Sequence, residues 1–497
     1  MKYSFISAEE AAASIHNGNT IGIGGFSSVG TPKAVPAALA VYAEKLHSEG
    51  KEFKVGLITG GATGSQVDSA LAQAHAVAFR TPFQSNKEMR NAINAGEVQY
   101  YDVHLSQIGQ DVRYGFLGAI DVAIVEASDI TEEGDIVLST SVGISPTLIQ
   151  VAHKVIIELN EAHASKLTGM HDIYIPDAPP YRREIPIYRV NDRAGSISVR
   201  VNPEKVVGVV RTNERDRIAA FTPLNDTTSR IGQNVADFLL GEYQRGAIPR
   251  EFLPLQSGVG NIANAVLGAL GADKKLPAFS MYTEVIQNSV IDLMMQERIR
   301  FVAGSSLTLS DDRLDMLYDN IDVMKERVLL RPQEITNHPE MIRRLGIIAV
   351  NTALEADIFG NVNSTHVLGS KMMNGIGGSA DFARNAYLSI FTTPSTAKDG
   401  LISSIVPHVS HVDSTEHDVR ILVTEQGVAD LRGKSPSQRA RCIIENCAHP
   451  DYKELLWDYL KLSEGKGCHT PMSLRNALKM HIAFAETGDM RNTKFEM

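Results

Sequence analysis

The chain has 497 residues, more than a single hydrophobic core usually organises, so two or three domains are expected. Its 43% hydrophobic and 21% charged residues are ordinary for a globular protein, and a net charge of −10 argues against nucleic acid as a partner, which needs a basic face. No segment approaches the roughly 20 apolar residues of a membrane span, and the polar start is unlike a signal peptide. Three cysteines without a CxxC motif favour a reducing, cytoplasmic location.

Apolar runs that end in glycine recur along the first part of the chain. Residues 20–26 predict a strand entering a glycine loop, residues 32–48 a helix, and residues 55–62 a second strand. Residues 121–127 and 154–159 are almost continuously apolar, which is typical of strands buried on both faces of a parallel sheet. Alternating strand and helix patterns of this kind predict an open α/β fold with right-handed crossovers.

Two features of the first part argue against simpler interpretations. The GxGGF motif at residues 22–26 does not continue into a full GxGxxG, because Ser27 follows, so a nicotinamide site is not favoured. Residues 161–200 are rich in proline and charge, and we expect an irregular excursion there.

A short internal similarity predicts two related domains. The block at residues 129–136 resembles the block at residues 357–362, and each follows an apolar run. A polar segment then precedes a long helical pattern that begins near Ser229. We therefore expect two similar open α/β domains, residues 1–222 and residues 223–497.

Glu284 is the most informative single residue. It ends the β-prone run at residues 279–283, and a helical pattern of apolar residues follows from 285 to 294. Proteins with an α/β fold usually place their catalytic and binding residues at strand-to-helix junctions of this kind. Glu425 has a similar setting after the apolar run at residues 420–424, although alone it is equally typical of a capping acid.

Glycine loops supply candidate binding surfaces. Residues 256–261 join a strand pattern to a helix pattern, and residues 374–378 carry three glycines before Ser379 and Asp381, which we expect to cap a helix. Such a loop predicts a nest of backbone N–H groups for a phosphate or an oxyanion, with an ordinary capped turn as the alternative. Lys398 is either a solvated turn lysine or a phosphate contact.

We expect no metal site. The histidines at 408, 411 and 417, with Asp413, have no spacing typical of metal ligands. Valines alternate with them, which favours the polar face of a strand.

Together these segments resemble the acetyl-CoA hydrolase/transferase family of the class I CoA-transferases. The resemblance covers essentially the whole chain, and its most specific parts are residues 256–261, 282–287, 375–386, 424–433 and 442–452. It implies two related α/β domains with the active site at the domain interface, a homodimer, and coenzyme A as a substrate rather than a permanently bound cofactor.

The resemblance also implies roles for individual residues. Glu284 corresponds to the family's nucleophile, Asn337 to an active-site asparagine and Glu425 to an active-site acid. The implied coenzyme A contacts are Val259, Gly260, Asn261, Ile262 and Ala263 in the first glycine loop, Asn374 and Gly378 in the second, and Lys398.

The implied reaction moves CoA between an acyl-CoA, such as acetyl-CoA or succinyl-CoA, and a carboxylate, such as acetate or succinate. It proceeds by a ping-pong mechanism through a transient thioester between Glu284 and CoA. A hydrolase that uses the same glutamate is the alternative enzyme, and an acyl-CoA sensor on the same scaffold is the alternative without catalysis. Arg217 is a candidate partner for a dicarboxylate, with a surface role equally open.

Overall fold

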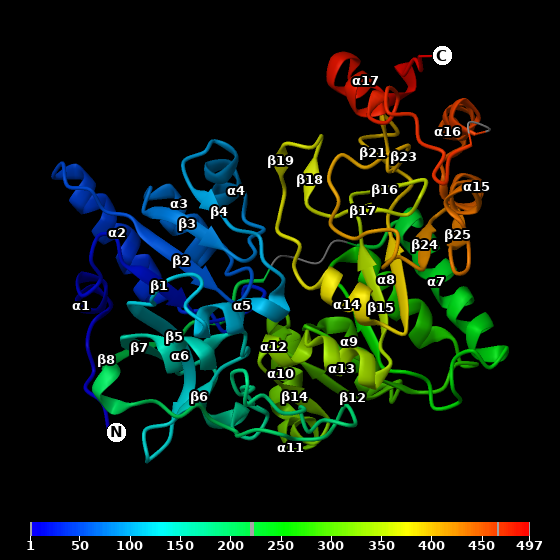
Figure 1. Ribbon diagram of the computed structural model, residues 1–497. Helices are drawn as coiled ribbons and strands as arrows, with labels where there is room; N and C mark the ends of the chain where they lie inside the picture. Colours follow the sequence, from blue (N-terminus) through cyan, green and yellow to red (C-terminus); the bar gives the residue numbers. More distant parts are fainter. Residues whose placement is uncertain (1, 219–222, 465–466, 497) are drawn as a thin grey trace. The chain divides into compact units, whose positions relative to one another are not determined.

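The computed structural model describes residues 2–218, 223–464 and 467–496. The chain forms two compact units, and neither is continuous in sequence (Figure 1). Unit 1 comprises Met1–Ala220, Ser280–Leu345 and Asn374–Asp381, and unit 2 comprises Phe221–Phe279, Gly346–Met373 and Phe382–Met497. The predicted boundary at residue 222 lies outside the described residues, and the division into residues 1–222 and 223–497 stays a prediction. No helix in the described part of the chain is long and apolar enough to cross a membrane.

A parallel sheet organises the first part of unit 1. Its strands follow the order β4-β3-β2-β1-β5-β7-β8, neighbours in this order run parallel, and β6 pairs antiparallel with β5. The strands are β1 (Thr20–Ile23), β2 (Val55–Thr59), β3 (Val77–Thr81), β4 (Gln99–Tyr100), β5 (Val122–Ile130), β6 (Ile136–Leu138), β7 (Lys154–Asn160) and β8 (Val206–Thr212). The helices of this part are α1 (Ala8–Ala13), α2 (Ala34–Ser48), α3 (Ala70–Gln73), α4 (Lys87–Asn94), α5 (Leu105–Arg113) and α6 (Ser145–Val151). The parallel α/β prediction is thus confirmed.

The alternation of side chains along β1 explains how helices cover both faces of this sheet. Ile21 and Ile23 point to one face, where they join a buried cluster with residues of α1, α2 and α3. Gly22 points to the other face, and a Cβ atom there would lie 2.5 Å from a methyl carbon of Leu148 in α6. Glycine therefore lets α6 pack directly on the strand.

The second part of unit 1 carries the candidate nucleophile. Strands β10, β12 and β14 are neighbours in that order, and β11 pairs parallel with β13. The elements are β10 (Phe279–Tyr282), β11 (Val285–Gln287), β12 (Ile299–Gly304), β13 (Ser306–Thr308), β14 (Val328–Leu330), α9 (Asn288–Met295), α10 (Asp311–Asp319), α11 (Ile321–Lys325), α12 (Gln333–Thr336) and α13 (Pro339–Leu345). The predicted helix after Glu284 is wrong in its start. Residues 285–287 are a strand, because they find a parallel partner in β13, and α9 begins only at Asn288.

Unit 2 contains a second sheet with strands in the order β9-β15-β20-β24-β25. The first four run parallel, and β25 returns antiparallel to β24. The larger elements are β9 (Leu255–Ser257), β15 (Ile348–Thr352), β20 (Leu388–Thr392), β24 (Ile421–Thr424), β25 (Gly427–Asp430), α7 (Asp226–Gln244), α8 (Asn261–Ala272), α15 (Pro436–Cys447), α16 (Pro450–Ser463) and α17 (Lys479–Thr487), and α14 (Ser379–Asn385) begins in unit 1. The small strands are β16 (Glu355–Asp357), β17 (Val362–Asn363), β18 (His366–Val367), β19 (Lys371–Met372), β21 (Thr396–Ala397), β22 (Ile402–Ser403) and β23 (Ile405–Val406).

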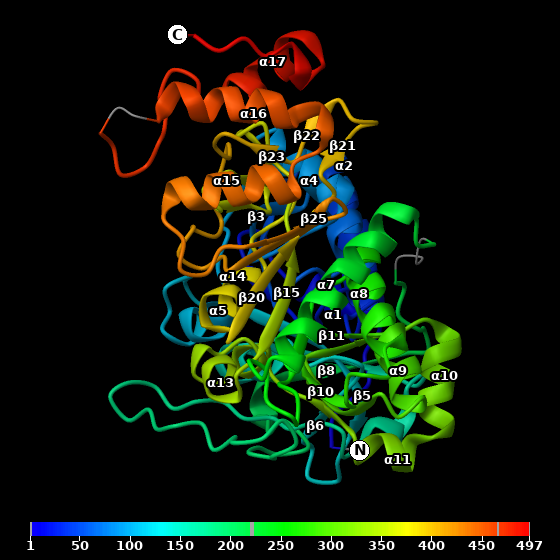
Figure 2. The same cartoon turned by 90° about the vertical axis from the view of Figure 1, so that its right-hand side faces the viewer.

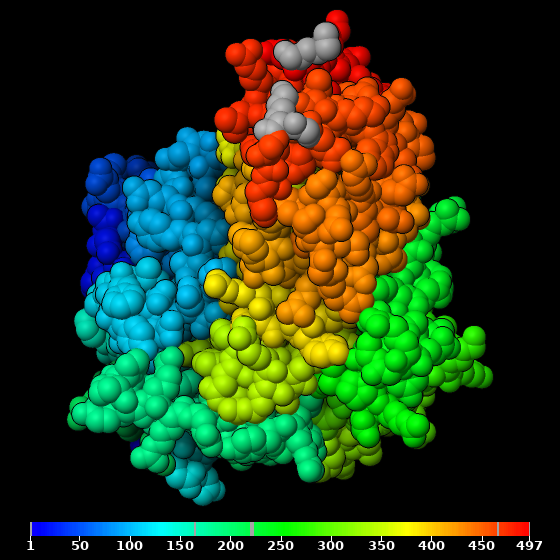
Figure 3. Space-filling view, turned by 45° about the vertical axis from the view of Figure 1, so that its right-hand side comes forward, coloured from blue at the N-terminus to red at the C-terminus, as the bar shows by residue number. Residues whose placement is uncertain are grey.

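Helices pack closely within unit 2. A Cβ atom at Gly232 of α7 would lie 2.6 Å from the backbone of Ala265 in α8, so this glycine sets the approach of the two helices. Helices α15 and α16 lie one beside the other in Figure 2 and bury Ile443, Ile444 and Leu456 in one apolar cluster. In Figure 3 the part of the chain that contains these helices is orange to orange-red.

The two blocks that resemble each other in sequence have the same local structure. Residues 129–136 turn from β5 into β6, and residues 357–362 turn from β16 into β17, each as an antiparallel hairpin. Gly134 and Gly360 have φ values of 91° and 96° in these turns, a conformation that favours glycine.

The proline-rich segment of unit 1 is irregular, as predicted. Between β7 and β8 the described chain has only short 3-10 turns and isolated bridges such as Ile173 with Ser196. Figure 2 shows this segment in green-cyan as long loops without helix or strand.

Candidate active site

The backbone of Glu284 is fixed between two strands of unit 1. Its carbonyl oxygen accepts hydrogen bonds from the N–H groups of Ser305 at 2.7 Å and Ser306 at 3.2 Å. The preceding residue, Thr283, donates its N–H to the carbonyl of Ala303 at 2.9 Å. Because Ala303 lies in β12, Ser306 begins β13 and Ser305 joins the two strands, these strands determine where the Glu284 side chain begins.

The Glu284 carboxylate is held by an amide. Asn337, at the C-terminal end of α12, donates its side-chain Nδ2 to Glu284 Oε1 at 2.8 Å. The carbonyl oxygen of the same amide accepts a hydrogen bond from the Thr336 hydroxyl at 2.9 Å. Asn337 is fully buried, so it has few alternative positions, and it presents an N–H rather than an oxygen to the carboxylate.

Gly378 lies directly against this pair. A Cβ atom at residue 378 would lie 2.1 Å from Glu284 Oε1 and 2.2 Å from Asn337 Nδ2, closer than any real side chain approaches. The structure therefore brings together three residues that the sequence predicted as site residues, Glu284, Asn337 and Gly378. The absence of a side chain at 378 is what makes room for the carboxylate.

The rest of the second glycine loop is anchored within unit 1. The N–H of Ile376 donates to both oxygens of Asp102 at 3.0 Å, so this group of the predicted nest is already occupied. Gly375 lies against Tyr100, whose hydroxyl would be 2.2 Å from a Cβ atom there. Asn374 donates its side-chain amide to the carbonyl of Gly375 at 2.9 Å.

Ser379 and Asp381 have different partners from the caps that were expected. The hydroxyl of Ser379 donates to the carbonyl of Ile376, and the carboxylate of Asp381 accepts hydrogen bonds from the N–H of Ser106 at 2.9 Å and its hydroxyl at 2.6 Å. Asp381 also lies 3.4 Å from Asn337 Nδ2. Asp381 and Ser106 are therefore members of the site that sequence reasoning missed. The only local signal was an acid in the turn after a glycine run.

Burial controls the protonation of the two carboxylates. Burial raises the pKa of Glu284 to about 7, with a smaller upward effect from the charge of Asp381, and the hydrogen bond from Asn337 acts in the opposite direction. Burial also raises the pKa of Asp381 to about 6, opposed by the hydrogen bonds from Ser106. A carboxylate with a pKa near 7 is more basic than a glutamate in water.

An apolar wall lies beside the nucleophile candidate. Val285 packs with Phe26, Leu105 and Phe83 in a small cluster of unit 1. Phe26 ends the GxGGF motif, and the next two residues, Ser27 and Ser28, both have positive φ values. Non-glycine residues in this conformation are uncommon and are often found at functional sites.

The first glycine loop belongs to unit 2. Residues 258–260 connect β9 to α8, so the predicted order of strand, loop and helix is present, but the loop is shorter than residues 256–261 because 256–257 end the strand and Asn261 begins the helix. Gly260 has a φ of 103°. Val259 is 52% exposed, whereas Ala263 is buried inside the helix. The loop thus presents an apolar side chain and the first turn of a helix to the outside of unit 2.

Lys398 also belongs to unit 2. It lies in the turn between β21 and β22, where Lys398 and Asp399 have φ values of 49° and 54°. Its ammonium lies over the ring of Phe484, 5.0 Å from the centroid. The side chain is exposed, so its charge is accessible to an anion.

Glu425 does not repeat the geometry of Glu284. It forms, with Gln426, the turn of the hairpin between β24 and β25, and no glycine loop and helix follow it. The N–H and hydroxyl of Ser395 both donate to its carboxylate. These hydrogen bonds lower the pKa of Glu425 against the effect of burial, so it is a carboxylate at neutral pH.

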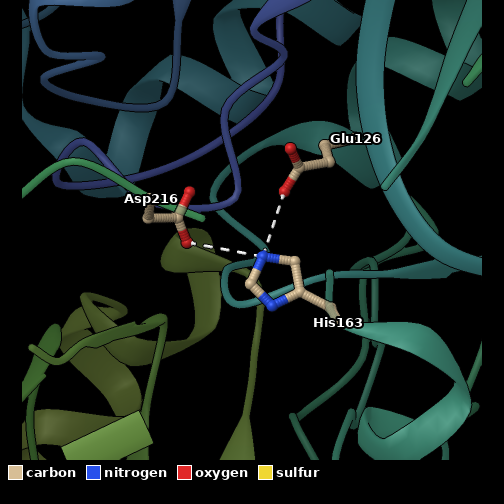
Figure 4. A group of neighbouring side chains, drawn as sticks. All are labelled: Glu126, His163 and Asp216. Carbon is tan, nitrogen blue, oxygen red and sulfur yellow. Dashed lines mark ion pairs between the residues drawn. The ribbon is translucent and has the colours of Figure 1, made fainter. Parts of the chain in front are cut away.

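The described residues contain one group with the spacing of metal ligands, which the sequence did not predict. Ligand atoms of Glu126, His163 and Asp216 lie within 4.8 Å of one another (Figure 4). His163 Nε2 is 3.9 Å from Glu126 and 3.8 Å from Asp216, whereas the Lys33 ammonium is 2.5 Å and 3.0 Å from the other oxygens of the same carboxylates. Since a lysine already compensates the buried charge, we interpret the group as an ion-pair network.

The prediction that the histidines at 408, 411 and 417 lie on the polar face of a strand is wrong. Strand β23 ends at Val406, and residues 407–413 are irregular, because Pro407 cannot donate to a ladder. His411 instead pairs with Asp413 at 3.3 Å and stacks on His366, with 4.0 Å between ring centroids. Arg217, the other open candidate, lies at the surface and pairs with Glu214 at 3.3 Å.

Comparison with known proteins defines the class. The model of the acetyl-CoA hydrolase/transferase N-terminal domain matches residues 2–211, and that of the C-terminal domain matches residues 314–460. A crystal structure of RipA from Yersinia pestis covers 92% of this chain and 97% of its own, with a TM-score of 0.71 and 23% identity, and shows the same fold. The chain belongs to the acetyl-CoA hydrolase/transferase family, and the predicted resemblance is confirmed.

Individual relatives refine this assignment. A protein named Succinyl-CoA:acetate CoA-transferase from Clostridium kluyveri is 48% identical over 98% of this chain and 90% of its own. A protein named Acetyl-CoA hydrolase from Schizosaccharomyces pombe is 46% identical over 96% and 94% of the two chains. The prediction of an enzyme of the CoA-transferase class is confirmed, with named hydrolases at similar identity.

Proposed function

We propose that the protein transfers CoA between an acyl-CoA and a short-chain carboxylate, with Glu284 as the covalent carrier. The observation that carries the proposal is the Glu284 carboxylate itself, held by the Asn337 amide at 2.8 Å against the backbone of Gly378. Its raised pKa makes it a stronger nucleophile than a glutamate in water, and its anchored backbone keeps it in one position.

The first half-reaction has two steps. An oxygen of Glu284 attacks the thioester carbonyl carbon, the C–S bond breaks, and the products are an acyl-glutamyl anhydride and the CoA thiolate. The thiolate then attacks the glutamyl carbonyl carbon, and the C–O bond of the anhydride breaks. The acyl group departs as a free carboxylate, and a glutamyl-CoA thioester remains. A second carboxylate reverses the two steps. No proton or electron is left over, because each step exchanges one anion for another.

The neighbouring residues have defined tasks in this scheme. The Asn337 N–H and the backbone near Gly378 are placed to stabilise negative charge on an oxygen that develops at Glu284. For the CoA moiety we propose the residues that the family resemblance implies, namely the loop from Val259 to Ala263, together with Asn374 and Lys398. The exposed charge of Lys398 suits a phosphate of the nucleotide. Glu425 is proposed as an active-site carboxylate, and the location of the site between the predicted domains stays a prediction.

The substrates proposed are acetyl-CoA or succinyl-CoA with acetate or succinate, as in the name of the relative from C. kluyveri. Coenzyme A is a substrate in this proposal, and no resident cofactor takes part. We also propose a cytoplasmic homodimer. The free state of Cys442, Cys447 and Cys468 agrees with a reducing compartment. Light scattering coupled to gel filtration tests the dimer.

A hydrolase is the second candidate function, favoured by the named acetyl-CoA hydrolases among the relatives. In a hydrolase, water takes the place of the second carboxylate and attacks the same glutamyl-CoA thioester. The discriminating assay follows acetyl-CoA with and without added succinate and measures both the new acyl-CoA and the free CoA thiol. The transferase predicts a new acyl-CoA only when the carboxylate is present, no continuous release of free thiol, and a CoA adduct on the peptide that contains Glu284. Continuous release of free thiol without a carboxylate would show that hydrolase is the correct name, and Glu284→Gln should abolish both activities.

A further inference from the structure

Asp381 is a buried acid at the start of α14, three residues after Gly378, and only 6% of it is exposed. Its carboxylate accepts two hydrogen bonds from Ser106, one from the hydroxyl at 2.6 Å and one from the backbone N–H at 2.9 Å. Ser106 is the second residue of α5, so the carboxylate lies at the N-terminal end of that helix, where an anion is favoured. These contacts fix the position of the acid.

The Asn337 amide lies between Asp381 and Glu284. Its Nδ2 carries two hydrogen atoms, one directed to Glu284 Oε1 at 2.8 Å and one toward Asp381 Oδ2 at 3.4 Å. A side-chain amide is nearly symmetric in shape and can turn by 180°. After such a turn the amide oxygen would face the nucleophile, and two negative oxygens would repel. An ionised carboxylate accepts hydrogen bonds but donates none, so Asp381 favours the orientation with the N–H groups toward both acids.

We infer that Asp381 is a positioning residue for the reaction: its carboxylate orients the Asn337 amide, and the amide in turn holds Glu284 in the attacking position. The inference rests on the proposed function of Glu284. The same arrangement also couples the two acids electrostatically, because the negative charge of Asp381 raises the pKa of Glu284. A further titratable group near the pair is His104, whose Nδ1 lies 3.8 Å from Asp381 Oδ1.

Asp381→Asn is the direct test, because the variant has the same shape and no charge. We expect kcat to fall by about 10- to 100-fold, in line with the loss that a misplaced catalytic group causes, while KM for the acyl-CoA stays within about threefold. The acid limb of the profile of kcat/KM against pH should move to lower pH, since Glu284 loses a neighbouring charge. His104→Gln should leave this limb in place. The charge-matched control is Asp322→Asn on the exposed side of α11, which should behave as wild type.

Two readouts separate positioning from folding. Thermal unfolding of each variant reports stability, and the rate of adduct formation on Glu284 in a single turnover reports attack. Should Asp381→Asn fold poorly, Ser106→Ala removes one of the two contacts to the acid and should lower the rate of adduct formation by about 3- to 10-fold. Adduct formation at the wild-type rate in folded Asp381→Asn or Ser106→Ala, with an unchanged pH profile, would overturn the inference. If Glu284→Gln is also fully active, the proposed function itself fails, whereas an inactive Glu284→Gln beside a fully active Asp381→Asn removes only the role of Asp381.

Discussion

A methyl group at residue 378 gives the sharpest prediction from the site. In Gly378→Ala the new Cβ atom would lie 2.1 Å from Glu284 Oε1 and 2.2 Å from Asn337 Nδ2. An ordinary contact requires the carboxylate to retreat by roughly 1 Å, and a misplacement of that size costs about 100-fold in rate. Gly378 does not have a positive φ, so the substitution adds no backbone strain. We therefore expect a specific loss of kcat from a protein that still folds.

The assay follows CoA transfer from acetyl-CoA to a carboxylate, together with the melting temperature. Gly268→Ala is the matched control, because it lies in α8 with no atom within 4 Å of the added methyl group. This control should keep full activity and gain up to about 1 kcal/mol in stability, since alanine favours a helix. Full activity in Gly378→Ala would refute the reasoning, because it would mean that Glu284 reacts from a different position.

Three further predictions concern charge. The folded state raises the pKa of Glu284 from 4.5 to about 7, so folding favours the protonated acid and the free energy of unfolding falls as pH rises through this range. Glu284→Gln removes this loss. The variant should therefore raise the melting temperature more at pH 8 than at pH 5, and the extra stabilisation at pH 8 is at most about 3 kcal/mol. Identical shifts at both pH values would contradict this. Arg80→Ala should destabilise the protein by about 3–5 kcal/mol in denaturant titrations, because Asp68 would keep a buried charge without its partner at 2.8 Å. Arg250→Ala at the exposed surface should cost little. Lys398→Ala should raise KM for acetyl-CoA about tenfold with less effect on kcat, and an unchanged KM would remove Lys398 from the CoA contacts, with Lys461→Ala as the neutral surface control.

The strands of the first part were predictable because burial on both faces of a parallel sheet requires continuous apolar runs. Residues 121–127 and 154–159 became β5 and β7 for this reason. The structure of the three residues after Glu284 was not decidable from the sequence, since a run that short fits a strand or a helix, and only the pairing with β13 selects the strand. The local geometry around Glu425 was misread in a similar way, because an acid shortly before a glycine looks alike in a hairpin turn and in a loop, and its role in the site stays a prediction.

The site residues also differ in whether the sequence could predict them. Glu284, Asn337 and Gly378 were available from the family resemblance, and their local patterns agree with it. Asp381 was named only as a helix cap, because a cap and a long-range acceptor have the same local sequence. Its partner Ser106 lies 275 residues away, and no local pattern reports a contact of that separation.

The discontinuity of unit 1 has a consequence in time. Its last piece, residues 374–381, is synthesised roughly 160 residues after Ala220, which takes about 10–30 s at ordinary rates of translation. During that interval the sheet around β1 can form, but Glu284 cannot yet contact Gly378, which has not been synthesised. A ribosome must therefore complete about three-quarters of the chain before the catalytic arrangement can exist at all. Slow translation between residues 284 and 378 would prolong a state in which the Glu284 carboxylate lacks its contact with Gly378.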